Sequence, residues 1–128
     1  MAFTWKIQSD CGDYTLKGTG SLGNNATSIS KELPCLPFGS VQVLVTAGTL
    51  RCQITSSNDG TNFSAGYSDI NASNLLGTVR PPLFTALAAS KNFDYPGFGA
   101  YKKNRLELTA GAGGFTGTVI IFLTRRAE

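Results

Sequence analysis

The sequence contains no histidine. Histidine is the commonest general base near neutral pH and the commonest metal ligand in proteins. Its absence excludes the usual serine and cysteine triads, in which a histidine removes the proton from the nucleophile. We therefore expect a protein that is not an enzyme and that needs no metal and no cofactor.

Cysteine is also scarce, with three residues at unrelated spacings, Cys11, Cys35 and Cys52. No Cys-x-x-Cys pair is present, and without histidine nothing completes a zinc site. We expect reduced thiols, as in a protein synthesised in a cytosolic compartment. One disulfide with one remaining free cysteine is the open alternative.

Long apolar runs are missing too. No run approaches the roughly 18 residues that a membrane-spanning helix requires, so we expect no membrane partner. The first eight residues alternate apolar and polar side chains and lack the layout of a secretory signal, so we expect residue 1 to begin the mature chain. With 41% hydrophobic and 15% charged residues the chain is far from the disordered class, and 128 residues fit one domain, 1–128.

The net charge of +3 is mild but uneven. Six of the eleven basic residues lie in the C-terminal third: Lys91, Lys102, Lys103, Arg105, Arg125 and Arg126. This predicts a positive end or edge, which suits an acidic protein surface better than nucleic acid, a partner that we do not expect. A solvated face that discourages pairing between strand edges is the simpler interpretation.

Apolar residues recur with a period of two, and the segments between them are rich in glycine, serine and asparagine, which predicts strands. The clearest runs are Phe3, Trp5 and Ile7, then Val41, Val43 and Val45, then Leu50, Cys52 and Ile54. Between the last two runs, residues 47–48 predict a hairpin turn. A second turn is predicted at residues 58–60, where a calcium loop is excluded because no closing glutamate follows.

The glycine-rich residues 111–117 predict a wide turn between paired strands at 105–109 and 118–124. Residues 119–123 are apolar on both faces, which is typical of a central strand or of one covered by a neighbouring subunit. Residues 84–89 fit a strand or a short helix, and residues 69–82 predict a long ordered loop. The chain is thus expected to be all-β, a single antiparallel β-sandwich of jelly-roll type with eight or nine short strands.

Candidate site residues are few. Asp94 and Glu107 lie in strand regions without the arrangement of a glycosidase pair. Aromatic rings could stack on sugars or bind a protein, although packing in the core and rim is the simpler interpretation. The interface candidates are Trp5, Tyr95, Phe98, Tyr101, Lys102, Lys103, Arg125 and Arg126.

Three segments together resemble a known group: residues 56–63 (SSNDGTNF), 104–109 (NRLELT) and 116–121 (TGTVII). This layout is similar to that of small β-sandwich virion proteins of tailed bacteriophages, and it covers residues 41–124. Phe63 stands where tryptophan is expected, and residues 69–82 are not part of the pattern. Residues 1–40 match nothing in it and are expected to form an arm or additional strands.

The resemblance implies a capsid decoration (cement) protein that binds the major capsid protein on the virion exterior after synthesis in the host cytoplasm. It also implies a homo-oligomer, with a trimer favoured. The alternative is a carbohydrate-binding module of a tail or adhesin, in which Trp5, Tyr95, Phe98 or Tyr101 would stack on sugar faces.

Overall fold

The computed structural model describes residues 2–9, 12–34, 36, 38–63, 67–68, 78–79, 82–94 and 103–125. These residues are all-β: they form nine strands and no helix, and hence no helix able to cross a membrane. The strands are β1 (Thr4–Ser9), β2 (Tyr14–Leu22), β3 (Thr27–Ile29), β4 (Phe38–Ser57), β5 (Tyr67–Ser68), β6 (Thr78–Val79), β7 (Phe84–Leu87), β8 (Lys91–Asp94) and β9 (Lys103–Thr124). Every pairing is antiparallel, so the predicted fold class is confirmed.

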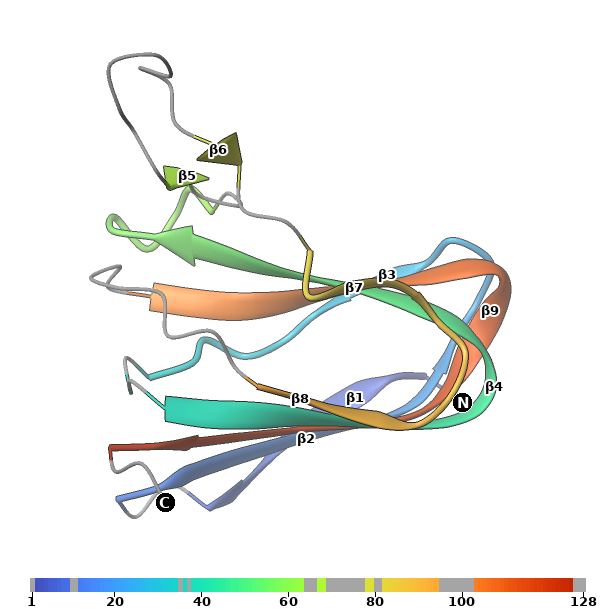
Figure 1. Cartoon of the computed structure of the whole chain (residues 1–128), viewed down its shortest axis with the longest axis horizontal. Helices are drawn as coiled ribbons and strands as arrows, with labels where there is room; N and C mark the ends of the chain where they lie inside the picture. Colours follow the sequence, from blue (N-terminus) through green and yellow to red (C-terminus); the bar gives the residue numbers. More distant parts are fainter. Residues whose placement is uncertain are drawn as a thin grey trace.

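Seven strands form one sheet, in the order β1-β2-β9-β4-β7, with β3 also paired to β9 and β8 to β4. Figure 1 shows that this sheet folds back on itself, so that its two halves face each other. The first layer holds β1, β2, β8, residues 38–48 of β4 and residues 115–124 of β9; the second layer holds β3, β7, residues 50–57 of β4 and residues 103–110 of β9. The layers are therefore halves of one sheet, where a β-sandwich has two sheets.

The two predicted glycine turns are wrong, because both segments lie inside long strands. Residues 47–48 belong to β4, and residues 111–117 belong to β9. The β4–β9 register shifts on both sides of residues 47–48, which marks bulges, and Gly48 and Gly114 have φ angles of 82° and 78°. Glycine serves a sharp bend in a strand as well as it serves a chain reversal, so the sequence signal for the two is the same.

The predicted pairing of residues 105–109 with 118–124 is wrong for the same reason. Each segment pairs with its own half of β4. The central position predicted for residues 119–123 is confirmed, since β9 runs between β2 and β4. Val119, Ile121 and Leu123 point into the core, while Ile120 and Phe122 point away from it.

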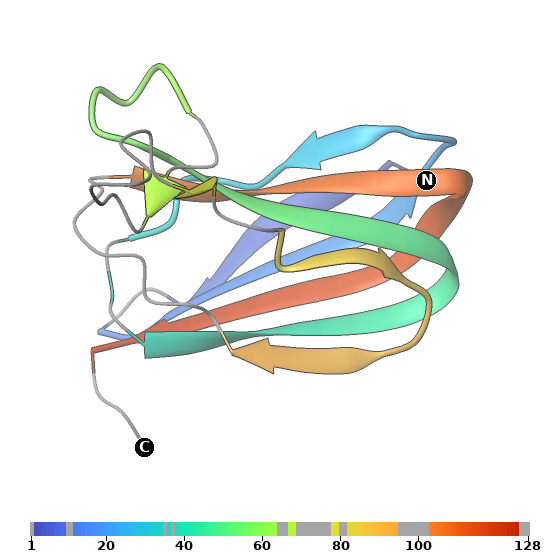
Figure 2. The ribbon, with the colours of Figure 1, turned by 45° about the horizontal axis from the view of Figure 1, so that its top comes forward.

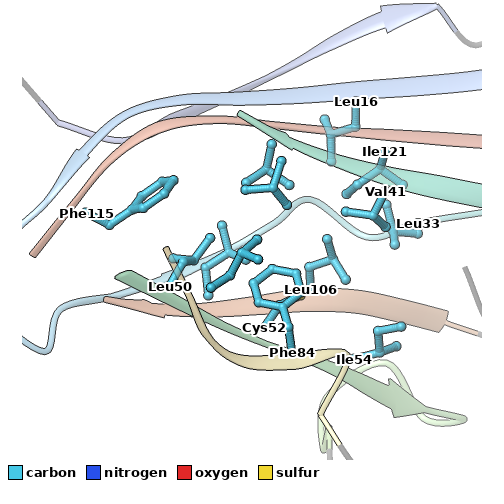
Figure 3. Packing of buried hydrophobic residues seen from close by; sticks show 14 of the residues in the cluster. Leu16, Leu33, Val41, Leu50, Cys52, Ile54, Phe84, Leu106, Phe115 and Ile121 are labelled. Carbon is cyan, nitrogen blue, oxygen red and sulfur yellow. The ribbon is translucent and has the colours of Figure 1, made fainter. Parts of the chain in front are cut away.

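The core lies between the two layers and draws apolar side chains from both. Leu16, Val41 and Ile121 enter from the first layer, and Leu50 and Leu106 enter from the second (Figure 3). All five side chains are fully buried. Each therefore contributes the full hydrophobic free energy of a buried aliphatic side chain, about 1.5–3 kcal/mol, to folding.

Aromatic side chains close both open sides of the core. On one side the indole Nε1 of Trp5 in β1 donates a hydrogen bond to Ser28 Oγ in β3, at 2.9 Å. On the other side Phe84 of β7 stacks on Phe93 of β8, with 4.8 Å between the ring centroids. Figure 2 shows how β7 in the second layer leads into β8 in the first.

Further segments whose structure was predicted from the sequence are described at least in part. Of residues 84–89, residues 84–87 form a strand, β7, and the N-terminal forty residues supply three strands of the sheet, β1 to β3, and the first residues of β4. Residues 58–60 form the predicted turn. Of residues 69–82 only 78–79, which form β6, and 82 are described.

Candidate functional site

One face of the first layer points away from the core, and we call this face the outer face. It carries the side chains that alternate with the core residues on β1, β2, β9, β4 and β8. Two cross-strand rows define it. The first row is Lys6, Lys17, Ile120, Gln42 and Asn92, and the second is Thr15, Phe122, Ser40 and Asp94.

The centre of the outer face is apolar. Phe38, Leu44 and Phe122 are 44%, 43% and 36% exposed, and Ile120 is half-buried beside them. All four lie on β4 and β9, the two central strands of the layer. An apolar centre surrounded by polar side chains is the arrangement found at protein interfaces.

Hydroxyl groups border this apolar centre on the side of β2. Thr19 Oγ1 lies 3.1 Å from Thr118 Oγ1, and Ser21 Oγ lies 2.9 Å from Thr116 Oγ1. Each bond joins residues directly opposite each other on β2 and β9. The bonds hold these side chains in place across the two strands, so the face is already ordered before a partner binds.

The charges of the outer face are separated by sign. Lys6 and Lys17 are exposed and directly opposite each other on β1 and β2, whereas Asp94 lies on β8 at the other edge. Like charges directly opposite on paired strands are destabilising. A partner that brings a carboxylate to the lysine side would relieve that repulsion.

A second surface lies at the open end of the fold, where strands begin and end away from the glycine bend. A cavity of about 530 Å³ is lined there by Ile7, Gly12, Asp13, Tyr14, Glu32, Leu33, Pro34, Leu36, Lys103 and Arg125. Lys103 Nζ forms a salt bridge with Glu32 Oε2 at 2.8 Å, and Thr124 Oγ1 donates to Asp13 Oδ1 at 2.7 Å. The cavity combines an apolar floor with a charged rim.

The predicted site residues fall in different places. Lys103 and Arg125 both line this cavity, although they stand at opposite ends of the sequence of β9: Lys103 is its first residue, and Arg125 directly follows its last. Trp5 is half-buried, and its indole is engaged with Ser28 and Phe3. Tyr95, Phe98, Tyr101, Lys102 and Arg126 lie outside the described residues.

Asp94 and Glu107 do not converge. Asp94 stands opposite Ser40 on the outer face, and Glu107 stands opposite Gln53 in the second layer. In the part of the chain that the structure describes, no group of three or more histidine, cysteine, aspartate or glutamate residues could hold a metal ion.

Two segments that carry the phage resemblance meet in space. The guanidinium carbon of Arg105 lies 3.7 Å from the centre of the Phe63 ring. A cation over an aromatic face is attracted by the electron density of the ring. Phe63 therefore serves as a stacking platform at the position where the resemblance expects tryptophan.

The turn at residues 58–60 is organised by one carboxylate. Asp59 accepts hydrogen bonds from the backbone N–H groups of Asn62 and Thr61, from the Asn62 side chain and from Ser57 Oγ. These donors hold the pKa of Asp59 well below its usual range. All the donors lie within three residues of Asp59 in the sequence, so the role of the carboxylate is to hold the local backbone.

Sequence reasoning did not identify the outer face as a site. The missed residues are Lys6, Lys17, Phe38 and Leu44; Ile120 and Phe122 lie in the run at residues 119–123, for which cover by a neighbouring subunit was one of two interpretations. One signal was present, since residues 119–123 are apolar on both faces and only one face of a strand can point into the core. Comparisons with protein-family models, curated proteins and solved structures found no significant match.

Proposed function

We propose that this chain is a non-enzymatic structural protein of a virion, a capsid decoration protein that stabilises a phage head by bridging major capsid subunits. The observation that carries the proposal is the presence of two contact surfaces on different sides of one rigid body. These are the apolar outer face and the charged cavity at the open end. A protein that bridges neighbours needs at least two such surfaces.

The fold supplies the rigidity that cohesion requires. The two layers share β4 and β9, and aromatic contacts close both sides of the core. A rigid body that touches two neighbours makes the second contact an intramolecular event, which raises the overall affinity far above that of either contact alone. A shell subunit then separates only when both contacts break.

The proposal also draws on the resemblance of residues 56–63, 104–109 and 116–121 to phage virion proteins, which favours a homotrimer on the capsid exterior. The alternative, a carbohydrate-binding module of a tail or adhesin, gains less support from the geometry. Trp5 is the aromatic candidate that the structure describes, and its half-buried ring packs edge-on against Phe3.

The test mixes the purified protein with undecorated phage shells, built from the major capsid protein of the phage that carries the gene. We expect saturable binding and shells that survive higher temperatures. The double variant Lys103→Ser/Arg125→Ser should weaken binding at least about tenfold, because it removes both cations from the rim of the cavity. Lys91→Ser, which removes an exposed lysine of β8, is the matched control and should bind normally.

Absence of saturable binding by the unsubstituted protein would sink the proposal. A glycan array addresses the alternative directly. A reproducible hit that is lost when Trp5, Tyr95, Phe98 or Tyr101 is replaced by alanine would favour the sugar-binding module, and the absence of any hit would count against it.

A further inference from the structure

We propose that the outer face is a self-complementary interface, through which two copies of this chain pair face to face about a two-fold axis parallel to the strands. The proposal rests on the register and the charges of the face alone. It assigns to a second copy a face that the proposed function assigns to the shell; in a dimer, contact with the shell would fall to the two cavities at the open ends, one on each copy.

The axis runs midway between β9 and β4 in this arrangement. It places β9 of one copy over β4 of the other, and it places β2 of one copy over β8 of the other, because the order of the layer is β1-β2-β9-β4-β8. Positions along the strands are preserved by such an axis. Each residue on β9 therefore faces the residue that is its own cross-strand partner on β4, supplied by the other copy.

The register then pairs large side chains with small ones. Phe122 is the cross-strand partner of Ser40, so the Phe122 ring of one copy faces Ser40 of the other. Leu44 is the partner of Thr118, so the Leu44 side chain faces Thr118. Packed sheets lie about 10 Å apart with interdigitating side chains, and this alternation of large and small lets two identical faces interlock.

The charges select this axis over the other face-to-face arrangement. With the axis parallel to the strands, Lys17 on β2 of one copy faces Asn92 on β8 of the other, and Asp94 lies two residues along that strand, diagonally across from Lys17. An axis across the strands would place β1 and β2 over themselves. Where that axis passes near the row of Ile120, Lys6 and Lys17 of both copies would converge, which like-charge repulsion disfavours.

The overlapping area approaches that of a standard interface. Because β1 projects beyond the partner copy, four strands overlap; spaced by about 4.8 Å, with nine residues rising about 3.4 Å each, they give a face of roughly 19 by 30 Å, or about 580 Å². Standard interfaces bury about 800 Å² per partner. Three of the five large hydrophobic side chains that are exposed in the described residues, Phe38, Leu44 and Phe122, would be covered.

An isologous contact closes with two copies. Size-exclusion chromatography with light scattering at about 50 µM should therefore give twice the 13.5-kDa mass of the chain. This departs from the trimer that the phage resemblance favours. A monomer or a trimer at this concentration would overturn the two-fold interface.

Two substitutions test the apolar centre. Phe122→Lys and Leu44→Lys each place a charge there and should weaken dimerisation at least about tenfold. Ile29→Lys is the matched control, because Ile29 is 44% exposed but lies on β3 in the second layer, away from the outer face. Circular dichroism establishes that each variant is folded. Equal loss of dimer in Ile29→Lys would contradict the assignment.

Charge reversal tests the geometry without touching the apolar centre. Lys17→Asp and Asp94→Lys should each weaken the dimer, because each places like charges diagonally across the interface between the copies. The double variant Lys17→Asp/Asp94→Lys restores opposite charges and should recover most of the affinity. Additive loss in the double variant would overturn the parallel axis.

Discussion

The backbone carbonyl of Gly114 occupies the place that a Cβ atom on Gly48 would need. Gly48 lies on β4 and Gly114 lies on β9, and the two strands bend together at this point from the first layer into the second. Both residues also have positive φ angles, 82° and 78°. The fold of the sheet onto itself therefore depends on two glycines that contact each other across the ladder.

Gly48→Ala should be strongly destabilising. The added methyl group meets backbone atoms, which cannot rotate away, and it also disfavours the left-handed conformation by roughly 1–2 kcal/mol. We expect a total loss of about 3 kcal/mol in the free energy of unfolding, measured by urea denaturation. Gly113→Ala is the matched control, because a Cβ at Gly113 meets nothing within 4 Å, and it should change stability little.

Trp5→Phe should lower the free energy of unfolding by about 1 kcal/mol, since it removes the hydrogen bond from the indole to Ser28 and keeps most of the ring. Ser28→Ala should cost a similar amount, because it leaves the indole N–H without this acceptor. In a double-mutant cycle the second substitution should then add little to the first. Two fully additive losses would show that the bond does not couple β1 to β3.

The stability contributed by Asp59 should depend on pH. Its pKa in the folded protein lies below the unfolded value of about 3.9, because the bound donors favour the ionised carboxylate. The contribution is therefore present above pH 4 and is lost as the pH falls through the folded pKa. Denaturant midpoints of the parent and of Asp59→Asn should differ at pH 7, and the difference should shrink as the pH falls from 4 to 2. A difference that stays constant with pH would contradict this assignment.

Cys52 should resist thiol reagents in the folded state. It is fully buried, and burial raises the pKa of its thiol to about 12, so little thiolate forms at pH 8. In the variant Cys11→Ser/Cys35→Ser, where Cys52 is the sole thiol, labelling should be slow in buffer and rapid in concentrated urea. Rapid labelling of the folded variant would mean that the core at Cys52 opens readily.

The fold class was predictable from local pattern, and the path of the sheet was not. Period-two alternation identified β1 and the two halves of β4, and the two-faced apolar run at residues 119–123 identified a central strand. The segments around Gly48 and Gly114 read as turns because glycine has the same local signature in a reversal and in a bend. Only the partner strand distinguishes the two, and the partner is distant in sequence.

The candidate sites were predictable to a smaller extent for the same reason. Phe38 and Leu44 look like core residues in the sequence, since their exposure depends on which face of β4 pairs inward. Lys103 and Arg125 were predicted as interface residues because of their charge. They line the same cavity because β9, which begins at Lys103, runs to the glycine bend and returns to the open end just before Arg125. The pairing of strands that are distant in sequence therefore determines both the exposure of Phe38 and Leu44 and the common position of Lys103 and Arg125.

Because β4 and β9 each run through both layers, two covalent chains join the layers at the glycine bend. The β4–β9 hydrogen bonds lie within each layer, so the apolar side chains buried between the layers are what hold one layer against the other. Under mechanical load the layers should therefore separate first at the open end and last at the bend.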